Sequence, residues 1–212
     1  MNRIWGYGED ALTLWALKER VSEILRKLGD QSHPSDCLVF YRPSFARGGE
    51  KANFGEFDAI LASPTSVYLI ESKWDGLSPN RKEEIELSDK QVLRHEIFAW
   101  YYRNWDGRRY HSWQEFKEAN EAAFPFENRR IAPEDSILAR NLEFVLNKLH
   151  NHGCSGKGIR NVLLYFYDGR RSKQIKRVKV PGRGIAFEVV NIEYGQYISG
   201  GFIPLPVSGI KA

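Results

Sequence analysis

The chain has 212 residues, 42% of them hydrophobic and 27% charged, and a formal net charge of +4. This length allows one domain with a substantial core, and the composition excludes a disordered or collagen-like chain. No apolar run reaches the ~18 residues of a membrane span, and the N-terminus lacks the apolar stretch of a signal peptide. Two distant cysteines, Cys37 and Cys154, suit a reduced compartment. We therefore expect a cytoplasmic protein with no membrane partner.

The N-terminal half is predicted to contain one helix followed by three strands. Apolar residues recur at helical spacing from Gly8 to Leu28, and Gly29 supplies a stop signal. Three strand-like runs come next: Cys37–Tyr41, Glu56–Ala62 and Val67–Trp74. The last two runs are joined by residues 63–66, Ser-Pro-Thr-Ser, a turn composition that predicts a hairpin.

Two helices and two strands are predicted in the remainder of the chain. Ser88 is suited to cap a helix from Asp89 to about Tyr102, and a second helix spans roughly Pro133–His150. Strands are predicted at Asn161–Tyr167 and Ile185–Ile192. The stretch at 105–128 is charged, aromatic and irregular, which indicates an insertion or lid at about 103–130. Together these elements predict a single α/β domain over residues 1–212, with a central mixed β-sheet flanked by helices.

The charge is unevenly distributed along the chain. Between Lys157 and Arg183 there are nine basic residues and one acid, Asp168, so this segment carries +8 and the rest of the chain −4. Such asymmetry is typical of a surface that binds a polyanion. The alternative is a solvated hairpin edge, since lysines commonly protect exposed strands from pairing with other chains.

Three charged residues converge at one end of the predicted hairpin. If the turn centres on residues 64 and 65, antiparallel partners have numbers that sum to 129, and Asp58 lies opposite Glu71. Glu71 and Lys73 are two residues apart on one strand, so their side chains point to the same face. The run Val67–Ile70 before them is apolar throughout, the pattern of a central strand buried on both faces.

Two readings of this cluster are open. Facing carboxylates repel each other across a strand pair, and a divalent cation with oxygen ligands would offset that repulsion. Lys73 alone could offset part of it, which would give a salt-bridged rim without a metal. The metal site is favoured because ionisable groups at the end of a buried strand are costly to keep without a function. A second Glu-x-Lys, Glu115-Phe116-Lys117, lies in a polar helical stretch and lacks this context.

The pattern of Asp58, a turn, an apolar strand and Glu71-Ser72-Lys73 resembles the PD-(D/E)xK nuclease superfamily, which has the restriction-endonuclease-like fold. In that family a helix carrying an acid precedes a hairpin with one Asp, and the next strand ends in Glu/Asp-x-Lys. The resemblance covers Gly8 to about Tyr102, and Phe57 stands where the nominal motif has Pro. The segments 55–58 and 71–73 look like those of the Holliday-junction-resolvase-like branch.

The resemblance implies a metal-dependent nuclease of the repair, recombination or restriction type that hydrolyses phosphodiester bonds in DNA. Asp58, Glu71 and the backbone carbonyl of Ser72 would bind Mg²⁺, or Mn²⁺ in its place, and Lys73 would orient the attacking water or stabilise charge on the phosphate. Related nucleases often act as dimers, so a homodimer is a further expectation.

The helix acid of the family motif has three candidates here, Glu9, Glu19 and Glu23. Glu9 is preferred because it lies closest to the apolar stripe and follows Gly8, as in the Gly-Glu opening of that helix in related bacterial proteins, with Glu19 second. A role at the helix N-terminus is the alternative for Glu9. RecB-like members carry Gln-x-x-x-Tyr after the third strand, and here Gln91 leads a matching stretch that ends in His95.

Contacts with DNA are expected from the helix after the hairpin and from the basic segment. The candidates are Gln91, Arg94, Arg170, Arg171, Lys173, Lys176 and Arg177. Two rival functions are kept: a catalytically silent nucleic-acid-binding module on the same fold, and a partner protein whose aromatic region Trp100–Phe126 forms a protein interface.

Overall fold

A five-stranded mixed sheet forms the centre of the computed structural model, which describes residues 3–46, 53–76, 81–180, 182, 184–195 and 200–206. Its order is β10-β8-β6-β5-β2, with β2–β5 and β5–β6 antiparallel and β6–β8 and β8–β10 parallel. The strands are β2 (Leu38–Tyr41), β5 (Ala59–Ala62), β6 (Ser66–Trp74), β8 (Gly158–Tyr167) and β10 (Phe187–Glu193).

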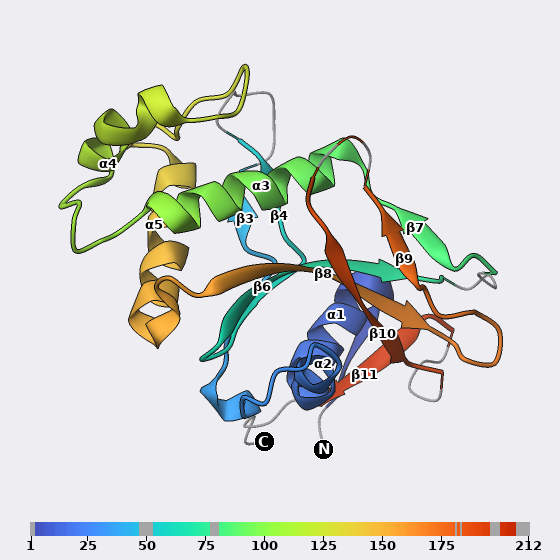
Figure 1. Ribbon diagram of the computed structural model, residues 1–212. Helices are drawn as coiled ribbons and strands as arrows, with labels where there is room; N and C mark the ends of the chain where they lie inside the picture. The colour runs from blue at the N-terminus through green and yellow to red at the C-terminus, as the bar shows by residue number, and fades with distance from the viewer. Residues whose placement is uncertain are drawn as a thin grey trace.

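Helices cover both faces of this sheet, so the predicted α/β class with a mixed sheet between helices is confirmed (Figure 1). On one face, α1 (Gly8–Glu19) and α2 (Val21–Lys27) pack on Leu61, Tyr68 and their neighbours. On the other face, α3 (Asp89–Asn104) and α5 (Ile137–Leu149) pack on the alternate residues of the same strands. No helix in the described ranges is long and apolar enough to cross a bilayer.

The β5–β6 hairpin has the register that its turn predicts. Ala59 pairs with Ile70 and Ala62 with Val67, so the partner numbers sum to 129. The predicted burial of β6 on both faces is also confirmed, because residues 67–72 are all buried. The charged end of β6 therefore emerges from the middle of the core.

Two predicted elements are interrupted. The helix expected from Gly8 to Leu28 breaks at Arg20, whose backbone (φ −127°, ψ 12°) leaves the helical region, and α2 then keeps its own apolar residues against the sheet. The strand expected over Glu56–Ala62 divides into β4 (Gly55–Glu56) and β5, because the buried Phe57 turns toward the α3 side of the core. This break leaves Asp58 at the very start of β5.

The segment at 105–128, expected to be irregular apart from a helical stretch around Glu115, contains the helix α4 (Trp113–Asn120), followed by the 3₁₀ turn η2 (Glu121–Ala123). Its aromatic side chains are buried against α3: Trp105, Tyr110, Trp113 and Phe116 are all 6% exposed or less. These rings form part of the core on the α3 side of the sheet. They are not available to bind a partner protein.

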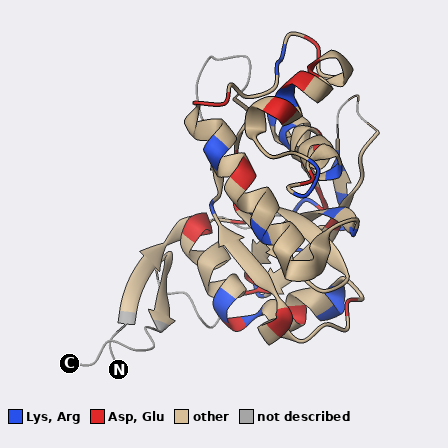
Figure 2. Cartoon of the chain, turned by 90° about the vertical axis from the view of Figure 1, so that its left-hand side faces the viewer, with Lys and Arg blue, Asp and Glu red and all other residues tan. Residues whose placement is uncertain are grey.

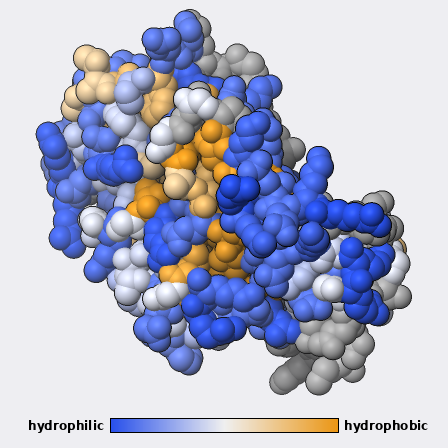
Figure 3. Space-filling model, turned by 45° about the vertical axis from the view of Figure 1, so that its right-hand side comes forward, coloured by the Kyte–Doolittle hydropathy of each residue, from blue (hydrophilic) through white to orange (hydrophobic). Residues whose placement is uncertain are grey.

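Smaller elements complete the described chain: η1 (Pro34–Asp36), η3 (His150–Cys154) and the strand pairs β1 (Arg3–Tyr7) with β11 (Phe202–Pro206), β3 (Ser44–Phe45) with β4, and β7 (Glu84–Glu86) with β9 (Arg177–Lys179). The β1–β11 ribbon projects from the body beside the start of α1 (Figure 2). On the side that carries β7, β9 and β10, the surface is mostly hydrophilic around a central apolar band (Figure 3).

A buried carboxylate fixes the turn end of the hairpin. Asp30, 7% exposed, accepts hydrogen bonds from the hydroxyls of Ser63 (2.6 Å), Thr65 (2.8 Å) and Tyr68 (2.7 Å) and from the backbone N–H of Ser32 (2.8 Å). Burial by itself would raise the pKa of Asp30, but these hydrogen bonds outweigh it and hold the pKa well below the ordinary value. The chain after α2 is thereby tied to the β5–β6 turn.

We expect Asp30→Ala to lower the free energy of unfolding by about 2–4 kcal/mol, because the hydroxyls of the buried Ser63 and Tyr68 and of Thr65 lose their shared acceptor. A carboxyl with a depressed pKa stabilises the fold above its unfolded pKa of about 3.9 and loses that contribution as the pH falls. Urea unfolding from pH 8 to pH 3 should show a constant difference from wild type that shrinks below about pH 4. Asp30→Asn, which keeps one acceptor oxygen, should lose less; an equal loss would contradict the hydrogen-bond account.

Candidate active site

Four charged side chains from three elements meet at the edge of the sheet where β6 ends. β6 carries Glu71 and Lys73, Asp58 precedes β5, and Glu9 lies in the first turn of α1. The backbone N–H of Ser72 donates a 2.7 Å hydrogen bond to Asp58 Oδ2 across the hairpin. This bond places the Asp58 carboxylate beside the end of β6, as the hairpin register predicts.

Glu9 is the helix acid that reaches this cluster. Its Oε2 accepts a 3.0 Å hydrogen bond from the backbone N–H of Trp74, and its Oε1 lies 3.4 Å from Lys73 Nζ. Gly8 allows this approach, because its φ of 72° is a left-handed conformation that glycine adopts without strain. Glu19 is exposed to solvent, and Glu23 pairs with Lys27 at 3.1 Å.

Glu71 is the most buried acid of the cluster, with 3% of the residue exposed. Arg94 Nη2 lies 3.2 Å from its Oε2, Lys73 Nζ lies 3.6 Å from its Oε1, and the amide of Gln91 donates a hydrogen bond to Oε1. Its Oε2 is buried and receives no hydrogen bond with acceptable geometry. The carboxylate thus keeps one buried oxygen with unmet acceptor capacity, although a cation is near.

The side chain of Lys73 lies between two of the three acids. Its Nζ donates to the carbonyl oxygen of Ser72 at 2.6 Å and approaches both Glu9 and Glu71, at 3.4 and 3.6 Å. Lys73 is therefore held at the same carbonyl to which the family resemblance gives a metal-binding role.

Gln91 and Arg94, for which contacts with nucleic acid remain a prediction, both contact Glu71 in this structure. Ser88 caps α3, as predicted, and the Gln91 side chain closes the capping box by accepting from the Ser88 N–H at 2.9 Å. The same side chain donates to Glu71, so the start of α3 is fixed to the candidate site. His95 turns into the core, where burial lowers its pKa to about 3 and its Nδ1 lies 2.9 Å from Asn161 Oδ1.

Thr13 is a site residue that sequence reasoning missed. Its hydroxyl lies 2.8 Å from Ser72 Oγ and 2.8 Å from the carbonyl oxygen of Glu9, and the residue is buried. Thr13 therefore links the helix acid to the strand end. Its position four residues after Glu9 puts both on one face of α1, and that spacing is the signal that could have identified it.

The pKa values of all three acids in the cluster are raised by removal from water. Burial raises the pKa of Glu71, and Arg94 and Lys73 compensate only in part. Burial likewise raises the pKa of Asp58 despite the hydrogen bond from Ser72, and that of Glu9 despite the charge of Lys73. Three carboxylates thus face two cations, Lys73 and Arg94, and additional positive charge at this point would stabilise them.

The oxygen atoms available at this edge of the sheet are of the kind that bind a hard cation. The described residues contain no group of three or more His, Cys, Asp and Glu side chains arranged to hold a metal. Two carboxylates and a carbonyl suffice for Mg²⁺, which usually retains several waters and uses one or two protein carboxylates. Asp58, the buried Oε2 of Glu71 and the carbonyl of Ser72 fit that requirement, with Lys73 as the competing cation.

The basic segment is largely paired with acids of the same chain. Arg170 and Arg171 lie 3.2 and 2.8 Å from Asp168, and Lys173 and Lys176 lie 3.5 and 2.9 Å from Glu83. Arg177 lies 3.8 Å from Glu84 at the β7–β9 pair. The acids that compensate this segment come mostly from the chain just before α3. The local excess of positive charge is therefore smaller than the sequence alone indicates.

Comparison of the chain with protein-family models, with curated proteins and with solved structures found no match.

Without added metal, we expect Asp58→Asn to raise the free energy of unfolding at pH 8 by an amount of the order of 1 kcal/mol. A carboxyl with a raised pKa destabilises the folded state while it is charged, and an amide oxygen can still accept from Ser72. The gain should decrease as the pH falls through the raised pKa, because folded wild type then takes up a proton. Glu118→Gln, on the exposed side of α4, is the control; a destabilised Asp58→Asn at pH 8 would contradict this account.

Proposed function

We propose that this protein is a divalent-metal-dependent nuclease that hydrolyses phosphodiester bonds in DNA. The observation that supports this most is the meeting of Glu9, Asp58, Glu71 and Lys73 at one edge of the sheet, where burial raises the pKa of all three acids. Acids whose pKa is shifted by full or partial burial are typical of functional sites, and a divalent cation would stabilise their charged forms.

A restriction-endonuclease-like core is the finer fold assignment that we propose. The order of elements supports it: α1 carries an acid, the β5–β6 hairpin carries Asp58, and β6 ends in Glu71-Ser72-Lys73. This is the order that the resemblance to the PD-(D/E)xK nucleases implies, and it involves the same residues.

The chain's own groups would divide the work of the reaction. A bound Mg²⁺ or Mn²⁺ would polarise the scissile phosphate and lower the pKa of a coordinated water. Asp58 and Glu71 are held in positions suited to bind this cation. Ser72 fixes the Asp58 carboxylate, and Arg94 and Gln91 fix that of Glu71. The Lys73 ammonium lies among these oxygens, where it would orient the attacking water and stabilise charge on the phosphate.

A nucleic-acid-binding module without catalysis is the second candidate function. The ion pairs of Lys73 with Glu9 and Glu71 and of Arg94 with Glu71 favour it, since such pairs can stabilise the cluster without a metal. The two candidates differ in one respect that can be measured: only the nuclease needs a divalent cation for turnover.

We expect Asp58→Ala and Lys73→Ala each to reduce Mg²⁺-dependent cleavage of DNA by at least about 100-fold, the cost of removing one charge-stabilising group from an active site. Initial rates should be measured on single-stranded, duplex and branched DNA. Lys117→Ala is the matched control, because it alters the other Glu-x-Lys of the chain, on α4. Full activity of Asp58→Ala on every substrate would overturn the site assignment.

A second measurement separates the two candidates. At 100 times its Kd, a cation that binds only the folded protein adds about 2.7 kcal/mol of stability, seen as a rise in the melting temperature. We expect Mg²⁺ or Mn²⁺ to raise the melting temperature of wild type and the effect to be lost in Asp58→Ala and Glu71→Gln. Salt-dependent DNA binding without a cation effect or turnover would instead support the silent module.

A further inference from the structure

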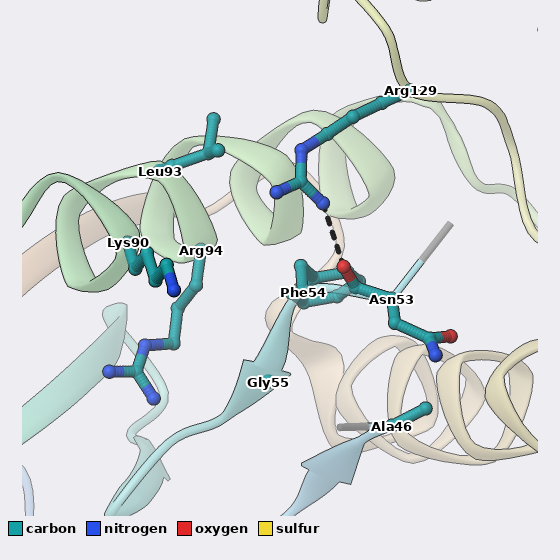
Figure 4. Close-up of a pocket in the computed structure, with 8 residues that line it drawn as sticks. All are labelled: Ala46, Asn53, Phe54, Gly55, Lys90, Leu93, Arg94 and Arg129. Carbon is teal, nitrogen blue, oxygen red and sulfur yellow. Dashed lines mark hydrogen bonds between the residues drawn. The ribbon is translucent and has the colours of Figure 1, made fainter. Parts of the chain in front are cut away.

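A basic pocket lies directly beside the candidate active site. It has a volume of about 320 Å³ and is bordered by Lys90, Leu93 and Arg94 of α3, by Asn53–Gly55 at β4, and by Arg129. Figure 4 shows Lys90 and Arg94 extending from α3, while Arg129 reaches over Asn53 from a separate segment of the chain. None of the described residues that line this pocket is acidic.

The three cations of this pocket differ in how they are held. Arg129 Nη1 donates a 2.7 Å hydrogen bond to the carbonyl oxygen of Asn53, which fixes the guanidinium at the pocket wall. Lys90 is exposed, one helical turn before Arg94 on the same face of α3. Cations from two distant parts of the chain thus share one concave space. This contrasts with the Lys157–Arg183 segment, where most of the basic side chains pair with nearby acids.

Arg94 connects the pocket to the acids of the candidate site. Its Nη1 donates to the carbonyl oxygen of Glu56, and its Nη2 lies 3.2 Å from Glu71 Oε2. Its Nε–H is buried and finds no acceptor in the described part of the chain. The guanidinium therefore borders both sites and keeps one unmet donor.

Two neighbouring residues at β4, Phe54 and Gly55, also line the pocket. Gly55 has a φ of 100°, a conformation that other residues rarely adopt. Phe54 is 7% exposed and apolar, so it adds no competing polar group. The pocket thus combines positive charge with a small concave volume.

We propose that this pocket binds a second phosphate group of the nucleic-acid substrate, separate from the phosphate that is cleaved. This inference rests on the proposed function and adds to it a fixed point that sets where the strand enters the site. Arginine and lysine together suit this ligand, because guanidinium groups bind phosphate oxygens in a fork and an ammonium adds a point charge. The phosphate is either a strand terminus or an internal phosphodiester, which share this chemistry.

Fluorescence anisotropy with a labelled single-stranded oligonucleotide tests the proposal, with Ca²⁺ replacing Mg²⁺ to slow cleavage. We expect Lys90→Ala and Arg129→Ala each to weaken binding about tenfold, the size of one charge-assisted hydrogen bond. Each should also reduce the magnitude of the slope of log K against log salt concentration by about 1, as expected for the loss of one phosphate contact. Lys148→Ala is the matched control, a helical lysine at a different pocket that also contains Glu143.

The 5′ end of the oligonucleotide distinguishes the two phosphate sources. A loss of affinity only for the 5′-phosphorylated oligonucleotide identifies a terminal phosphate, and an equal loss for the 5′-hydroxyl form identifies an internal phosphodiester. Wild-type affinity of both variants for both oligonucleotides would overturn the proposal. During turnover, the variants should raise KM and leave kcat close to wild type, because the pocket would bind a phosphate other than the one that is cleaved.

The same assays keep failure of this inference apart from failure of the proposed function. Normal cleavage with unchanged affinity and KM in both variants rejects the phosphate pocket and leaves the nuclease intact. Pocket-dependent binding without turnover by wild type rejects catalysis and leaves the pocket intact. Absence of any oligonucleotide binding by wild type would overturn both.

Discussion

The hydrogen bond from the Ser72 backbone to the Asp58 carboxylate is the contact on which the arrangement of the site depends. It joins Ser72, the last buried residue of strand β6, to the residue just before β5, at the point where the hairpin leaves the core. The register of the hairpin makes this contact possible, and the Asp30 network at the opposite end holds that register. Tight packing on both faces of β6 then prevents the charged strand end from moving away.

Holding acids at this position has an electrostatic cost that the neighbouring elements reduce only in part. α1 contributes Glu9, a third negative charge, and α3 contributes Arg94 and the Gln91 amide, both directed at Glu71. If the cluster served stability alone, a neutral or apolar replacement would serve at least as well, because buried ion pairs rarely stabilise more than well-packed apolar residues do. An excess of carboxylates around the buried Glu71 is better explained by a function that uses their charge.

Local patterns predicted the parts of the site that depend on short-range geometry. The turn composition at residues 63–66 gave the pairing of Asp58 with the end of β6, and the Gly-Glu sequence singled out Glu9 among three acids. The pairing of β1 with β11 joins the two ends of the chain, and two prolines make β11 an unpromising strand from sequence. The neutralisation of the basic segment depends on β7 lying beside β9, a long-range contact without a local signal.

The sequence and the structure point to different basic surfaces. Counted along the chain, the cations concentrate at Lys157–Arg183, yet folding places Glu83, Glu84 and Asp168 against most of those that the structure describes. The cations of the basic pocket come from two separate parts of the chain, Lys90 and Arg94 on α3 and Arg129, so no count along the chain reveals it. Electrostatic attraction of a polyanion depends on unscreened charge in a concave site. By that criterion the pocket at α3, which no described acidic side chain lines, fits the proposed phosphate better than the segment richest in lysine and arginine does.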